Sequence, residues 1–186
     1  MALSDAPSHE LSELHALVEG ALRVAQAHPT TETTRKERHR ARGRHLVLAL
    51  ADALRQHEGG DVDALSRYHD GARDRLGTTE LLHDVTVARS VQIGEYWYLT
   101  EVLWQAECQL ALDPRDGVHD FNKLVLGSAR HKLFVAATVP DPAELLRTLE
   151  PAAARCTGRV FLALVPHPDH WDGDIAGSVR TWQFRR

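Results

Sequence analysis

Residues 80–109 read ELLHDVTVARSVQIGEYWYLTEVLWQAECQ, and this stretch decides the fold class of the chain. It contains a run rich in β-branched residues, 81–88, and the start of a longer run, 96–112, on either side of the turn sequence Ile93-Gly94-Glu95. Two such runs around a glycine-containing turn are typical of an antiparallel hairpin. The stretch therefore predicts two adjoining β-strands.

The second predicted strand separates apolar from polar side chains. Successive side chains of a strand point to opposite faces. One face then carries Tyr98, Val102, Trp104, Ala106, Cys108 and Leu110, and the other carries Glu101, Gln105, Glu107 and Gln109 with Leu99 and Leu103. Asp84 lies early in the first strand, where it can oppose Glu107. The hairpin thus predicts an oxygen-rich site of the kind that a hard divalent cation prefers.

The chain after the hairpin alternates between helical and strand patterns. We expect a helix over 120–126, a buried strand over 133–137, a helix opened by Asp141-Pro142-Ala143-Glu144, a fully apolar strand over 160–165 and an edge strand over 179–184. This order predicts a single α/β domain over 1–186 with a central mixed β-sheet flanked by helices.

The chain before the hairpin is predicted to be helical and contains one strongly basic segment. Apolar residues at three- and four-residue steps predict a helix from Ser8 to His28, and a second helix runs from Leu46 to about Gln56. Between them six of ten residues are basic, namely Arg35, Lys36, Arg38, Arg40, Arg42 and Arg44. Residues 61–77 predict only a short helix or strand with a loop.

Composition limits the class of protein. The 186 residues suffice for one hydrophobic core, and the formal charge of −4 excludes a wholly basic nucleic-acid wrapper. Cys108 and Cys156 form no CxxC motif, which favours a reducing compartment. Because no signal sequence or membrane-spanning run is found, we expect a cytoplasmic protein without a membrane partner.

Three short motifs carry a resemblance to a known family: Glu80-Leu81-Leu82-His83-Asp84, Ala106-Glu107-Cys108-Gln109 and Asp120-Phe121-Asn122-Lys123-Leu124. Residues 78–140 resemble the PD-(D/E)XK nuclease-like superfamily, and in particular its small bacterial members. The resemblance implies a restriction-endonuclease-like core over 78–165, preceded by the N-terminal helices of residues 1–60. It also implies that Asp84 and Glu107 bind Mg²⁺ or Mn²⁺ and that Gln109 occupies the place of the motif lysine, with Lys123 as its substitute.

These observations lead to one expected function. We expect a metal-dependent phosphodiester hydrolase acting on nucleic acid, with DNA as the favoured partner. The sequence is compatible with a homodimer. Asp84 and Glu107 hold the metal, Gln109 positions the attacking water and Lys123 stabilises charge. The basic residues Arg38, Arg40, Arg42 and Arg44 are expected to contact phosphates.

The same residues allow simpler interpretations. Asp84 is also interpretable as a strand-end residue, Glu107 and Lys123 as solvated surface groups, and Asp120 as the N-cap of its helix. A protein that kept the nuclease fold but only binds nucleic acid or protein is the alternative function, and an ordinary α/β interaction protein is a third. His167-Pro168-Asp169-His170 approaches zinc-ligand spacing, but Pro168 favours a polar loop there.

Overall fold

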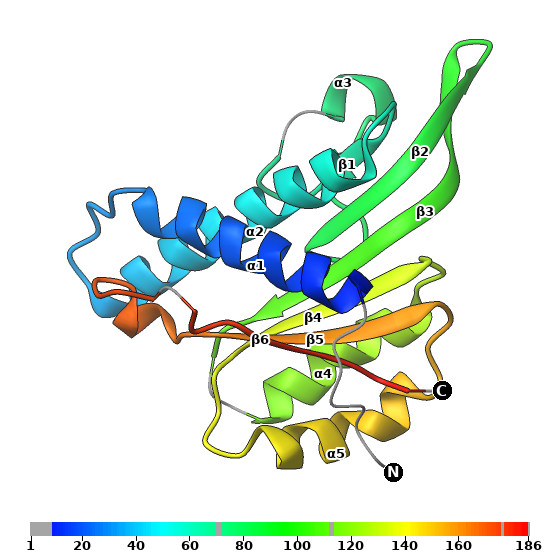
Figure 1. The fold of residues 1–186 in the computed structure, drawn as a ribbon. Helices are drawn as coiled ribbons and strands as arrows, with labels where there is room; N and C mark the ends of the chain where they lie inside the picture. The colour runs from blue at the N-terminus through cyan, green and yellow to red at the C-terminus, as the bar shows by residue number, and fades with distance from the viewer. Residues whose placement is uncertain (1–8, 70–71, 112–113, 176, 186) are drawn as a thin grey trace.

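The structure, a computed structural model, describes residues 9–69, 72–111, 114–175 and 177–185, which form three layers (Figure 1). The middle layer is a six-stranded sheet made of β1 (Asp63–Leu65), β2 (Val85–Ile93), β3 (Tyr96–Gln109), β4 (His131–Ala137), β5 (Arg159–Val165) and β6 (Arg180–Gln183), neighbours in that order. β3, β4 and β5 are parallel, and the other neighbours are antiparallel. This confirms the predicted α/β class with a mixed sheet flanked by helices.

Two pairs of helices cover the two faces of the sheet. On one face lie α1 (His9–Ala27) and α2 (Arg35–Glu58), and on the other lie α4 (Pro114–Leu126) and α5 (Pro142–Ala153) (Figure 1). The short helices are α3 (Arg73–Leu76) and the 3₁₀ turn η1 (Pro168–His170). No helix among the described residues is both long enough and apolar enough to span a membrane.

Each face of the sheet has its own hydrophobic core. The core beneath α1 and α2 contains Leu22, Leu50 and Trp104, and the core beneath α4 and α5 contains Phe121 and Phe134. Every side chain of β5 from Val160 to Val165 is buried, as the apolar run predicted for a strand covered on both faces. The N-cap predicted at Asp141 is also present, because its Oδ1 accepts the Glu144 backbone N–H at 3.0 Å.

Helix α2 begins eleven residues before its predicted start at Leu46. Its N-cap is Thr34, whose hydroxyl accepts the Glu37 backbone N–H at 3.3 Å and donates to Glu37 Oε2 at 2.7 Å. This reciprocal cap starts the helix at Arg35, so the basic segment is helical. The prediction of a helix confined to 46–56 was therefore wrong at its N-terminal end.

The hairpin has the predicted turn but different strand limits and two register shifts. β2 runs from Val85 to Ile93, later than the predicted 81–88, and Gly94 in the turn has a φ of 62°. In β3 the pairing skips one residue beside Ala88 and one beside Ser90, so strict alternation fails there. Leu103 is consequently buried in the same core as Trp104, and Tyr98, predicted to be in the core, is 48% exposed. Leu112, the last residue of the predicted strand, lies outside the described residues.

Candidate active site

Glu107 is the most deeply buried carboxylate of the candidate site. Its β3 position is in register with Phe134 of β4, so its side chain faces the core beneath α4 and α5. The residue has 0% exposure, and its Oε2 accepts a hydrogen bond from Lys123 Nζ at 3.0 Å. Its other oxygen, Oε1, is buried without a hydrogen-bond partner among the described residues. A buried carboxylate oxygen without a partner is costly, which makes it a candidate ligand atom.

Lys123 reaches this acid from α4. Phe121 and Leu124 of the same helix are fully buried against the sheet, which places Lys123 at the border of the packed face. Its Nζ contacts Asp120 Oδ1 at 2.8 Å as well as Glu107. Burial alone would lower the pKa of Lys123, but the hydrogen bonds to Asp120 and Glu107 raise it above its ordinary value. Lys123 is therefore a cation held between two acids.

Asp84 joins the site directly before β2 begins. Val85 faces the core beneath α1 and α2, so the preceding side chain lies on the opposite face, the face of Glu107. The backbone N–H of Cys108 donates to Asp84 Oδ2 at 2.9 Å, which ties this carboxylate to β3 beside Glu107. Burial raises the pKa of Asp84, while the Cys108 N–H and the charge of Lys123 oppose the shift.

The two acids affect one another electrostatically. Burial raises the pKa of Glu107 to about 8, and the negative charge of Asp84 adds to the shift, whereas Lys123 opposes it. Two carboxylates in one partly buried place repel each other unless a cation lies between them. The side chains predicted to share a metal, Asp84 and Glu107, thus lie on the same face of adjoining strand ends.

Gln109 lies further along the same face of β3 and is held by hydrogen bonds at both ends of its amide. Its Nε2 donates to Asp120 Oδ2 at 2.8 Å, and its Oε1 accepts the Ala111 backbone N–H at 2.9 Å. These bonds position Asp120 and the chain at the end of β3. The predicted role of Gln109 in orienting a water stays a prediction.

Asp120 and His83 are site residues that the sequence reasoning missed. Asp120 was interpreted as an N-cap, but α4 begins at Pro114, so Asp120 lies inside the helix and faces Lys123 and Gln109. His83 is 2% exposed, and its Nε2 lies 3.0 Å from the Lys123 backbone carbonyl, so it connects the chain before β2 to α4. The spacing of Asp120 and Lys123 by three residues on one helix was the available signal.

The donor set suits a partly hydrated ion. Among the described residues, Asp84, Glu107 and Asp120 do not place three ligand atoms within 4.8 Å of one another. Lys123 takes up space between Glu107 and Asp120. Asp84 and Glu107 offer carboxylate oxygens, the ligand type of Mg²⁺, an ion that keeps several waters and takes one or two protein carboxylates. Glu80, another acid near the site, pairs with Arg67 at 3.0 Å.

The four arginines expected to contact phosphates have different environments. Arg42 is 7% exposed and is bound to the Pro168 carbonyl and to Asp172, so it has structural partners within the chain. Arg38 is half-buried and donates to the Thr33 carbonyl at 3.1 Å. Arg40 and Arg44 are exposed and pair with no carboxylate in the described part of the chain, although Arg44 lies over a tyrosine ring. Only these last two present a free positive surface.

A separate hollow of about 320 Å³ opens on the other face of the sheet. It is lined by residues that include Glu10, Leu14, His57, Trp104, His131 and Arg159. His131 and Arg159 begin β4 and β5, whereas Glu107 is in register with Phe134 further along β4 and faces the other side of the sheet. We therefore do not assign the hollow to the candidate active site.

Comparison of the chain with protein-family models, with curated proteins and with solved structures gave no match. The site is therefore defined by the geometry of its own residues: two acids on one face, a half-buried lysine and an acid that holds the lysine.

Proposed function

We propose that this protein is a Mg²⁺- or Mn²⁺-dependent phosphodiester hydrolase of nucleic acid, built on a restriction-endonuclease-like core. The observation that carries the proposal is Glu107. This carboxylate is fully buried, one of its oxygens has no partner among the described residues, and its neighbours are the acid Asp84 and the amine of Lys123. A structural ion pair needs no second acid and leaves no unpaired oxygen, so the arrangement favours a ligand function.

The residues of the site would share the work as follows. Asp84 and Glu107 would hold the ion. When bound, Mg²⁺ or Mn²⁺ supplies a water of lowered pKa and neutralises phosphate charge. Lys123 would supply the fixed positive charge that the motif lysine gives in the resembling family, because its amine points at Glu107 from the neighbouring helix. Asp120 and Gln109 would position this amine.

The test is cleavage of plasmid DNA, single-stranded DNA and RNA by the purified protein in Mg²⁺ or Mn²⁺. We expect cleavage of at least one substrate and a loss of about a hundredfold or more in Glu107→Gln, which keeps the side-chain shape but removes the charge. Glu101→Gln is the matched control on the same strand, because that carboxylate pairs with Arg89 and Arg130 away from the site. Circular dichroism would show that both variants fold.

Two results would contradict the proposal: equal cleavage by wild type and Glu107→Gln, or the absence of cleavage of every substrate. The second candidate function is a binding module without catalysis. It is favoured by the two ion pairs of Lys123, since Glu107 and Asp120 already neutralise the charge of this amine. That function predicts nucleic-acid binding that is sensitive to salt and insensitive to EDTA.

A further inference from the structure

Two histidines and an aspartate from distant parts of the sequence converge on the sheet face opposite the acids. His39 lies in the second turn of α2, and His167 and Asp169 lie at η1, directly after β5. One ligand atom from each of the three side chains lies within 4.8 Å of the others. His39 Nε2 contacts Asp169 Oδ1, and the two imidazole rings lie edge to face with centroids 4.8 Å apart.

The surrounding structure holds these three residues in place. Arg35, His39 and Arg42 are spaced by four and three residues, so they share the face of α2 that is turned to η1. Arg42 binds the Pro168 carbonyl and Asp172 from this face. On the other side, buried Trp171 donates from Nε1 to the Pro166 carbonyl at 2.8 Å. The turn is therefore fixed to the helix whether or not an ion is bound.

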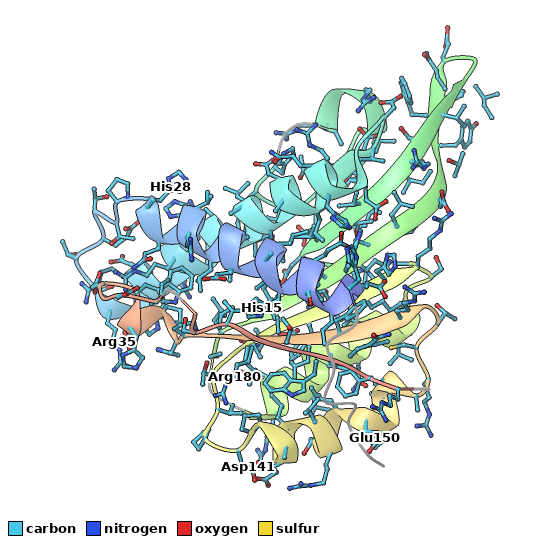
Figure 2. The ribbon with its side chains drawn as sticks, viewed as in Figure 1. His15, His28, Arg35, Asp141, Glu150 and Arg180 are labelled. Atoms are coloured by element: carbon cyan, nitrogen blue, oxygen red, sulfur yellow. The ribbon has the colours of Figure 1, made fainter. Side chains whose placement is uncertain are left out.

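Asp169 also has a second partner that orients it. Arg35 Nε donates to Asp169 Oδ1 at 3.1 Å, and Arg35 Nη2 pairs with Oδ2. Figure 2 shows Arg35 at the start of α2, beside the chain that forms η1. The ligating carboxylates of metal sites are commonly hydrogen-bonded in this way, which fixes the oxygen that faces the ion. Arg35 Nη2 can keep its bond to Oδ2, whereas an ion at Oδ1 would replace the hydrogen bonds that Arg35 Nε and His39 Nε2 make with this oxygen.

We propose that His39, His167 and Asp169 form a binding site for Zn²⁺ that joins α2 to the turn after β5. Two imidazole nitrogens with one carboxylate are ligands that suit Zn²⁺ and are unsuited to Mg²⁺, which prefers oxygen. Three protein ligands leave a fourth position for water or another ligand. The site does not depend on the proposed nuclease function, because it uses other residues on the other face of the sheet.

The experiment is titration of the metal-free full chain with Zn²⁺ by calorimetry, with the melting temperature as a second readout. We expect one Zn²⁺ per chain and a higher melting temperature in Zn²⁺ than in EDTA. His39→Ala should weaken Zn²⁺ binding by about tenfold or more and abolish the thermal shift, because it removes a ligand. Loss of a residue that only hydrogen-bonds to a metal ligand already lowers metal affinity by about tenfold or more. His119→Ala, an exposed histidine on α4, is the control and should bind as wild type.

Glu107→Gln separates this proposal from the nuclease proposal. It should keep full Zn²⁺ affinity, because Glu107 lies beneath α4 and not at η1. Asp169→Asn tests the carboxylate and should also weaken binding, with circular dichroism to show that it folds. Unchanged Zn²⁺ affinity in His39→Ala and Asp169→Asn, or no saturable binding by the wild type, would overturn the site.

Discussion

The burial of Glu107 makes the stability of the protein depend on pH. Its pKa in the folded chain is about 8, against an ordinary value of 4.5, so the folded state keeps a proton that the unfolded state loses between these pH values. Stability then falls as pH rises through this interval, by at most about 1.4 kcal/mol per pH unit. We expect wild type to lose about 1–3 kcal/mol relative to Glu107→Gln between pH 5 and pH 8, measured by urea unfolding in EDTA.

The matched control for this pH effect is again Glu101→Gln. It removes one carboxylate from the same strand, but that carboxylate is partly exposed and pairs with Arg89 and Arg130. We expect the pH-dependent difference in unfolding free energy between wild type and Glu107→Gln to exceed that between wild type and Glu101→Gln. A Glu107→Gln curve that runs parallel to that of the wild type would show that burial does not raise the pKa of Glu107.

At the residue scale, alternation along β3 was enough to predict that Glu107 and Gln109 share a face. It also placed Asp84 opposite them, because that part of the hairpin has no register shift. Asp120 and His83 were missed for a physical reason. Each contacts α4, which begins at Pro114 and not at the predicted residue 120. Helix limits are the least certain part of a sequence-based prediction. The contact of His39 with Asp169 spans 130 residues and has no signal in local spacing.

At the scale of elements, the outer half of the hairpin stands apart from the rest of the sheet. β1 pairs with β2 only at Thr86–Ala88, and β4 pairs with β3 only from Trp104 onwards. From Arg89 to the end of β2, and from Tyr96 to Leu103 in β3, the two strands pair only with each other. Figure 1 shows this part of the hairpin extending away from the other strands. The sequence predicted a hairpin but not this projection, because β-propensity does not show which strands have two neighbours.

This arrangement predicts opposite outcomes for two aromatic residues of one strand. Tyr98→Thr should change the free energy of unfolding by less than about 0.5 kcal/mol, because the tyrosine is about half exposed beyond the neighbouring strands. Trp104→Ala should lower the free energy of unfolding by about 3–5 kcal/mol, because this side chain is 3% exposed and packs on His131 with the ring centroids 4.5 Å apart. Chemical denaturation of both variants measures the difference. Similar losses would mean that the projecting part contributes to the core.

At the scale of the whole molecule, three features meet at one edge of the sheet. The acids lie at the end of β3, the histidine cluster follows the end of β5, and Gly43 of α2 lies next to Leu110, directly after β3. Functional groups commonly gather at the carboxyl ends of parallel strands, because the loops that follow them converge there. The order of elements made this edge predictable, whereas the basic part of α2 reaches it only because the helix starts at Arg35, well before the predicted Leu46.

The position of α2 leads to a prediction about nucleic-acid binding that depends on the proposed function. Arg40 and Arg44 are exposed, near the end of β3, and not paired with a carboxylate among the described residues. If each contacts one phosphate, the double variant Arg40→Gln/Arg44→Gln should reduce the slope of log affinity against log salt by about two, as measured in EDTA. The control Arg147→Gln/Arg155→Gln removes two exposed charges, one on α5 and one just after its end, and should leave the slope unchanged. Because both variants lower the net charge by the same amount, an equal loss of slope would mean that overall charge, and not this edge of the sheet, attracts the nucleic acid.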